Sequence, residues 1–227
     1  MSKRVHAVSE CVSPVATIAR SLTLVLTRVG SPSPFSRSQY SSSIDSTHNR
    51  LARSMREALK LRTLVISNSG SDKSHFAEGL GALINAPIFD LDLILWCENA
   101  FETKQDEDVA RHKVANLAAT ERWVIEGVYG WLAEVAVPRA TALIWLDIPW
   151  KVCREGLLAR GQRRGGTEAD FSELLKWAEA YWDRQTPTSF KGHRRLFEGF
   201  SAAKLRIGTR READDLLSDL TAHMNQK

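Results

Sequence analysis

The residues around Lys73 have the types and spacing of a loop that binds phosphate. Residues 63–66 predict a buried strand, and the loop Ser67-Asn-Ser-Gly-Ser-Asp-Lys-Ser74 follows it, leading into a predicted helix over residues 73–83. In such a unit, backbone N–H groups and the helix N-terminus bind the anion, the lysine contacts the outer phosphates and the hydroxyl binds Mg²⁺. The candidate anion-binding residues are Asn68, Ser69, Gly70, Ser71, Asp72, Lys73, Ser74 and His75.

Two positions of this loop depart from the strict pattern G-x-x-x-x-G-K-[ST]. Ser67 stands at the first glycine position and Asp72 at the second, so that only the internal Gly70 remains. At ~4 Å and an effective dielectric near 20, the Asp72 carboxylate would repel one phosphate charge by roughly 4 kcal/mol. We therefore expect nucleotide affinity to be about one to three decades below that of an intact loop. The alternative interpretation is a polar turn that caps a helix.

Short apolar runs alternate with helical patterns along the chain. Strands are predicted at 63–66, 87–89, 123–125, 142–146 and 204–207, and helices at 73–83, at 106–120, from Pro149 and from Thr209-x-x-Glu212 through Leu220. Five buried strands, each followed by a helix, predict an α/β fold with a parallel sheet covered on both faces. Ligands bind at the carboxyl ends of such strands, where this sequence gathers its polar residues.

Residues 1–54 differ from the rest of the chain. They are rich in serine and contain seven Lys or Arg and two acids, whereas residues 55–227 contain 24 basic and 25 acidic residues. Three interpretations of the segment compete: an organelle transit peptide, a disordered tail, and an over-extended start with Met55 as the true initiator. We favour the last, because the first predicted strand begins within ten residues of Met55. The predicted domain is 55–227.

The composition argues against several functional classes. The basic surplus lies in residues 1–54, so nucleic-acid binding by the folded part is not favoured. The three cysteines and six histidines show no metal-ligand spacing, and the cysteines are odd in number. This favours a reducing compartment and a cytoplasmic location, or an organelle if residues 1–54 are a transit peptide. No transmembrane helix is predicted, since Pro14 and Arg20 interrupt the apolar stretch 12–29. The sequence carries no signal for an oligomeric state.

Four short motifs together resemble one known family. They are Asn68-Ser-Gly-Ser71 with Lys73-Ser74, Asp90-Leu-Asp92 followed by Trp96, Trp123-Val-Ile-Glu-Gly-Val-Tyr129, and Leu146-Asp-Ile-Pro149. From about residue 64 to residue 217, the chain resembles the nucleoside-monophosphate-kinase-like branch of P-loop kinases. Within that branch it looks like bacterial proteins labelled adenylate kinase-like or topology-modulation-like. The resemblance implies a P-loop NTPase fold, ATP and Mg²⁺ as cofactors, and transfer of the γ-phosphoryl group to a small acceptor.

The resemblance also implies roles for particular residues. Lys73 and Ser74 would serve the donor phosphates and Mg²⁺, and Asp92 would contact the acceptor or a metal-bound water. Asp90, Glu126 and Gly127 would line the acceptor site, and Thr209 and Arg210 would border the adenine ring. A mobile lid over about 154–190 would bring Arg160 and Arg164 to the transferring phosphoryl group, with Arg184, on a predicted helix over 174–184, as a further candidate.

Each of these roles has a simpler structural alternative. Asp92 can cap a helix, Glu126-Gly127 can form a turn, the lid arginines can form a solvated basic loop, and Thr209 can belong to a capping box. The seven tryptophans are predicted to be mostly core residues.

Three functions are therefore compared. The first is an active kinase with an unidentified acceptor. The second is a nucleotide-binding regulatory protein with an impaired site, which the altered loop favours. The third is a nucleic-acid-associated factor, which is supported only by the basic segment 1–54.

Overall fold

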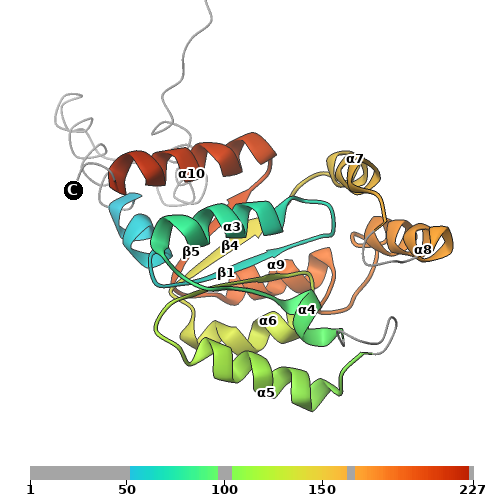
Figure 1. The fold of residues 1–227 in the computed structure, drawn as a ribbon, viewed down its shortest axis with the longest axis horizontal. Coiled ribbons are helices and arrows are strands. Elements are labelled where there is room, and N and C mark those ends of the chain that lie inside the picture. The colour runs from blue at the N-terminus through green and yellow to red at the C-terminus, as the bar shows by residue number, and fades with distance from the viewer. Residues whose placement is uncertain (1–51, 97–103, 163–166, 225–227) are drawn as a thin grey trace, which may run out of the picture.

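The computed structural model describes residues 52–96, 104–162 and 167–224 (Figure 1). A parallel sheet of five strands lies at its centre, in the order β2-β3-β1-β4-β5. The strands are β1 (Arg62–Ser67), β2 (Ile88–Asp90), β3 (Trp123–Gly127), β4 (Ala142–Leu146) and β5 (Ala203–Ile207). All five lie where the apolar runs predict them.

Helices cover both faces of the sheet, so the predicted three-layer α/β fold is confirmed (Figure 1). They are α3 (Lys73–Ile84), α4 (Leu91–Leu95), α5 (Glu107–Ala118), α6 (Gly130–Ala136), α7 (Trp150–Arg160), α8 (Glu168–Glu179), α9 (Phe190–Gly199) and α10 (Arg210–Met224), with a 3-10 turn, η1 (Val137–Arg139). α3 and α10 lie on one face, and α5, α6 and α9 on the other. α7 and α8 stand at the end of the sheet where the loop between β1 and α3 lies.

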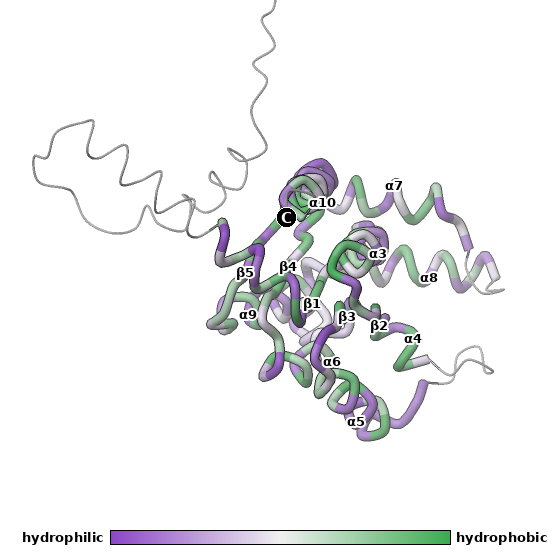
Figure 2. Tube along the Cα trace, turned by 60° about the vertical axis from the view of Figure 1, so that its left-hand side comes forward, coloured by the Kyte–Doolittle hydropathy of each residue, from purple (hydrophilic) through white to green (hydrophobic). Residues whose placement is uncertain are grey.

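The sheet separates two hydrophobic clusters, and successive side chains of β1 point to opposite ones. Val65 faces the cluster under α3 and α10, whereas Leu64 and Ile66 face the cluster under α5, α6 and α9. Along α5 and α10, hydrophilic and hydrophobic residues alternate, as expected of helices that place one face on a sheet (Figure 2). Within the described residues, no helix combines the length and apolarity that spanning a membrane requires.

Several sequence-based expectations need correction. β2 is not buried: it pairs only with β3, so it forms an edge of the sheet, and Ile88 is 39% exposed. α4, α6 and α9 were not predicted. Of the tryptophans, Trp96, Trp131 and Trp150 pack against the two core clusters, and only Trp123 and Trp145 are fully buried. The others in the described residues are half-buried, and two of them turn the indole N–H to a polar partner, as Trp150 does to Glu179.

A helical segment over residues 52–59 crosses the predicted boundary at 54/55. Its side chains Met55 and Leu59 are 7% and 0% exposed, and they pack in the cluster under α3 and α10. The rest of the predicted N-terminal extension, residues 1–51, lies outside the described residues. The segment 52–59 is thus part of the folded unit.

The order of the strands brings three chain segments together at the carboxyl end of the sheet. β1 lies between β3 and β4, with Val65 paired to Glu126 and Ser67 paired to Leu146. The chain passes from β1 to β2 on one side and from β3 to β4 on the other, so the carboxyl end of β1 lies at the switch point where open α/β sheets bind ligands.

Candidate functional site

The loop after β1 presents a series of N–H groups that make no hydrogen bond. The first helical hydrogen bond of α3 runs from the Phe76 N–H to the Asp72 carbonyl, at 3.0 Å, and the Ser69 N–H donates to Asn68 Oδ1. Among the described residues, the N–H groups of residues 70–75 have no partner. They belong to the loop and the first turn of a 12-residue helix, whose dipole adds positive potential there. This arrangement suits an anion.

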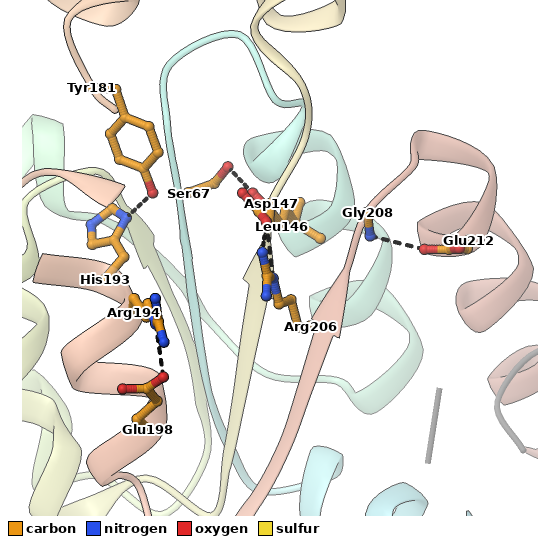
Figure 3. Close-up of polar contacts among 10 residues, drawn as sticks. All are labelled: Ser67, Leu146, Asp147, Tyr181, His193, Arg194, Glu198, Arg206, Gly208 and Glu212. Atoms are coloured by element: carbon orange, nitrogen blue, oxygen red, sulfur yellow. Dashed lines mark hydrogen bonds and ion pairs between the residues drawn. The ribbon is translucent and has the colours of Figure 1, made fainter. Parts of the chain in front are cut away.

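Two side chains and a closely packed glycine fix the shape of the loop. The Ser67 hydroxyl donates to the Leu146 carbonyl on β4, as Figure 3 shows. Asn68 Nδ2 donates to the Ala178 carbonyl of α8 at 2.8 Å. Gly70 has φ 78°, and a Cβ there would lie 2.2 Å from the Cys153 carbonyl oxygen of α7. Ser67 and Asn68 therefore position the loop.

Glu126 joins the two side chains expected to serve the phosphates. It is 1% exposed at the end of β3. It accepts a hydrogen bond from Ser74 Oγ at 2.6 Å, and its other oxygen lies 3.5 Å from Lys73 Nζ. Burial opposes the charge of the Lys73 ammonium, but the carboxylates of Glu126, Asp92 and Asp90 outweigh it and raise its pKa. Lys73 thus stays charged and remains among the predicted site residues.

Asp90 and Asp92 extend this group of charges. Asp90 accepts from the Asp92 N–H at 2.7 Å and so caps α4. Burial, followed by the carboxylates of Asp92 and Glu126, raises the pKa of Asp90 to about 6. Asp92 Oδ1 is buried without a hydrogen-bond partner, and so is Ser71 Oγ in the loop. Such atoms can accept from, or bind, a group that enters the site.

Asp72 takes a conformation and a partner that the sequence did not predict. It is in the left-handed region, with φ 66° and ψ 22°. Its carboxylate oxygen Oδ2 lies 2.5 Å from Nε of Arg210, the first residue of α10. The repulsion expected from Asp72 is therefore offset by a neighbouring cation.

Thr209 and Arg210 both have structural partners. The Thr209 hydroxyl accepts from the Glu212 N–H at 3.1 Å, and the Glu212 carboxylate accepts from the Gly208 N–H, which Figure 3 draws. Figure 3 also shows the ion pair between Asp147, just after β4, and Arg206 on β5. The predicted capping motif starts α10, with Gly208 rather than Thr209 as the backbone donor.

The predicted lid arginines lie at different places. Arg160 is exposed at the last residue of α7, and Arg164 falls in 163–166, outside the described residues. The predicted helix over 174–184 is displaced toward the C-terminus, since α8 spans Glu168–Glu179. Arg184 follows α8, where its guanidinium donates to the Trp177 and Thr188 carbonyls and lies 4.3 Å over the Trp177 ring. It therefore caps the end of α8.

Two other residues at this edge have packing or contact roles. Gly127 is required by packing, because a Cβ there would lie 2.6 Å from Leu91 Cβ. Tyr129 accepts from Trp96 Nε1 at 3.2 Å, and its ring lies 6.4 Å from the Trp177 ring. Burial, and next the Asp92 carboxylate, raise the pKa of Tyr129 to about 12. Tyr129 ends the motif Trp123–Tyr129 but had no predicted role, and its position just after Glu126-Gly127 is the signal that could have placed it here.

The site fits a polyphosphate with its cation better than a metal alone. Among the described residues, no three His, Cys, Asp or Glu side chains are arranged to hold a metal ion. The Ser74 hydroxyl gives its hydrogen to Glu126, which leaves its oxygen lone pairs for a cation. Mg²⁺ commonly binds through one or two protein oxygens together with substrate phosphates.

Comparison with known proteins adds structural likenesses. No protein-family model and no curated protein matches this sequence. Shikimate kinase from Bacteroides thetaiotaomicron is similar in structure, with a TM-score of 0.46 and 16% identity, over 73% of this chain and 99% of that chain. A gluconokinase from Sinorhizobium meliloti has a TM-score of 0.42 and 19% identity, over 72% and 95%. At these identities and TM-scores, the likenesses do not identify an activity for this chain.

Proposed function

We propose that this protein is a P-loop kinase that binds Mg-ATP on the loop after β1 and transfers the γ-phosphoryl group to a small acceptor. The observation that supports it most is the set of N–H groups over residues 70–75 that lack partners, beside the buried ammonium of Lys73. Phosphoryl transfer needs positioning and charge neutralisation more than covalent chemistry, and these groups can supply both.

The carboxylates have distinct roles in this proposal. Glu126 orients Ser74 and Lys73 toward the donor phosphates. Asp92, with one buried oxygen lacking a partner, is placed to accept the proton of an acceptor hydroxyl or to hold a metal-bound water. Asp90 fixes Asp92 through the cap of α4. Bound Mg²⁺ would neutralise phosphate charge.

The acceptor side is acidic within the described residues. Asp90 and Asp92 lie there, while the guanidinium of Arg184 is bound to backbone carbonyls. We propose that the acceptor offers a hydroxyl group.

A binding assay on the full chain tests the nucleotide site. Mg-ATP affinity is measured by calorimetry for the wild type, for Lys73→Ala and for Lys60→Ala, whose lysine pairs with Glu57 away from the loop. We expect Lys73→Ala to lose at least tenfold in affinity and Lys60→Ala to match the wild type. Equal affinity in all three proteins would place any ATP elsewhere and contradict the proposal.

A second candidate function is nucleotide binding without turnover in a regulatory protein. The observation that favours it is Asp72, an acid in the phosphate loop. An assay of ADP formation from Mg-ATP separates the two functions. It is run on the wild type and on Asp72→Gly, with a panel of monophosphates and small alcohols as acceptors. Turnover by the wild type supports the kinase, and turnover only in Asp72→Gly supports the impaired site. No turnover in either protein, together with no measurable affinity for ATP, would rule out both functions.

A further inference from the structure

Asp72 does not act as an ordinary acidic N-cap. An aspartate before a helix normally turns its carboxylate to the N–H groups of the second and third helical residues. Here Asp72 makes no such bond, and the first-turn N–H groups stay without partners. If the carboxylate took them, it would occupy the place of an anion. The position of this side chain therefore decides whether the loop can bind phosphate.

Arg210 holds that side chain away from the first turn of α3. Its Nε lies 2.5 Å from Asp72 Oδ2, and its Nη2 donates to the Gly70 carbonyl at 3.0 Å and to the Val152 carbonyl at 3.4 Å. One guanidinium thus contacts the acidic residue, the loop backbone and α7. Its planar set of donors allows several contacts to be made at once.

Gly156 on α7 provides the space for this guanidinium. A Cβ at Gly156 would lie 2.3 Å from Arg210 Nη2 and 2.8 Å from the Gly70 oxygen. Glycine is unfavourable in a helix interior, and Gly156 lies within the 11 residues of α7. The packing of Arg210 gives a reason for the glycine.

The ion pair between Arg210 and Asp72 contributes more to the charge balance of the loop than to the stability of the fold. The Arg210 and Asp72 side chains are 35% and 47% exposed, and exposed pairs contribute little to folding because water screens them. A bound polyphosphate carries several negative charges, and the net charge beside it changes by one unit when the guanidinium is removed.

We propose that Arg210 compensates for the acidic residue in the phosphate loop, by turning the Asp72 carboxylate away from the anion site and neutralising it. Arg210 is a positioning residue, and the loop binds a polyphosphate despite lacking the usual glycine. The inference rests on the proposed nucleotide site. It gives Arg210 a role different from the adenine contact that the resemblance implies.

A double-mutant cycle on the full chain tests the inference, with Mg-ATP as the ligand. Arg210→Gln is made in the wild type and in Asp72→Asn, which keeps a residue that tolerates the left-handed conformation but removes its charge. Arg211→Gln is the matched control, because Arg211 is the next residue and is 90% exposed, with its partner Asp215 on α10. Thermal unfolding of each variant is measured in parallel.

We expect Arg210→Gln to weaken ATP binding by roughly tenfold or more in the wild type and by less than about threefold in Asp72→Asn. Arg211→Gln should leave the affinity for ATP unchanged, and the melting temperatures of all variants should change little. An equal loss of affinity in both backgrounds, or no loss in the wild type, would overturn the inference. If only Asp72→Asn binds ATP, Arg210 does not compensate, although the loop is still a nucleotide site. If no variant binds ATP, the inference and the proposed function fail together.

Discussion

At the residue scale, Glu126 is the side chain that the other charged groups of the site depend on. It is almost fully buried between Ser74 and Lys73, and it lies level with Asp90 across the β2–β3 pairing. A buried ammonium that loses its anionic partner is strongly destabilising.

The variant Glu126→Gln keeps the size of the side chain and an acceptor for Ser74 but removes the charge facing Lys73. We expect the free energy of unfolding to fall by about 2–4 kcal/mol. Glu198→Gln is the control, because Glu198 pairs with Arg194 on an exposed face of α9 and should cost less than about 0.5 kcal/mol. Urea denaturation measures both, and similar small losses would mean that Lys73 does not need Glu126.

The raised pKa of Asp90 predicts a dependence of stability on pH. Below the usual pKa of 3.8 the carboxyl group is protonated in the folded and unfolded states alike. Between 3.8 and about 6 the folded state binds more protons, so the free energy of unfolding falls as the pH rises, and the full cost is present above about 6.

Asp90→Asn removes this cost and keeps an acceptor for the cap of α4. We expect it to be more stable than the wild type by about 1–3 kcal/mol at pH 8, with the difference vanishing near pH 4. Asp106→Asn, the same exchange at the N-cap of α5, is the control. Denaturation in urea from pH 4 to pH 8 is the measurement. A gain for Asp90→Asn that is the same at every pH would count against the charge as its cause.

Part of the site was predictable because parallel strands place their carboxyl ends together. Three strands of one sheet lead to the charged residues: the loop after β1 leads to Lys73, β2 ends at Asp90, and Glu126 lies near the end of β3. Predicting the strand ends therefore places these residues together at the carboxyl end of the sheet. The contact between Asp72 and Arg210 was not predictable in this way. No spacing in the sequence indicates that the first turn of α10 reaches the loop after β1, because that depends on how both pack against α7.

At the element scale, the apolar runs predicted every strand, and the motif Thr209-x-x-Glu212 marked the start of α10 correctly. α4 was missed because a five-residue helix contains too few turns for a periodic pattern. α9 is ten residues long and is also held by tertiary contacts: His193 is fully buried, with Nδ1 2.8 Å from the Tyr181 hydroxyl and Nε2 3.0 Å from the Val128 carbonyl oxygen.

The contact of α9 with the segment after α8 predicts opposite effects at its two glycines. A Cβ at Gly192 would lie 2.3 Å from the Pro187 carbonyl oxygen, whereas a Cβ at Gly199 has no atom within 4 Å. We expect Gly192→Ala to lower the free energy of unfolding by about 2 kcal/mol or more, and Gly199→Ala to raise it by roughly 0.5 kcal/mol. Chemical denaturation of the pair measures the contrast. Equal effects would mean that Pro187 does not pack closely on α9.

At the scale of the whole molecule, a helical segment before β1 belongs to one of the two cores. The predicted domain begins at Met55 and so includes the packed residues Met55 and Leu59, but no helix was predicted there, because a short helix that gains its stability from packing leaves little pattern in the sequence. The structure places residues 52–59 against α3, α10 and the sheet, so that this segment closes one of the two cores.

Leu59 tests whether this segment belongs to the cooperative unit. Its side chain is 0% exposed, whereas Leu61, two residues later, is 39% exposed. Leu59→Ala should therefore lower the free energy of unfolding by about 2–4 kcal/mol through lost burial and a residual cavity, and Leu61→Ala by less than about 1 kcal/mol. Urea unfolding is followed by tryptophan fluorescence, to which Trp123 and Trp145 in the other core contribute together with Trp150, which packs against the core of Leu59. Coincident transitions by fluorescence and far-UV circular dichroism would show that both cores unfold together. A small change for both variants would show that residues 52–59 can detach without opening the sheet.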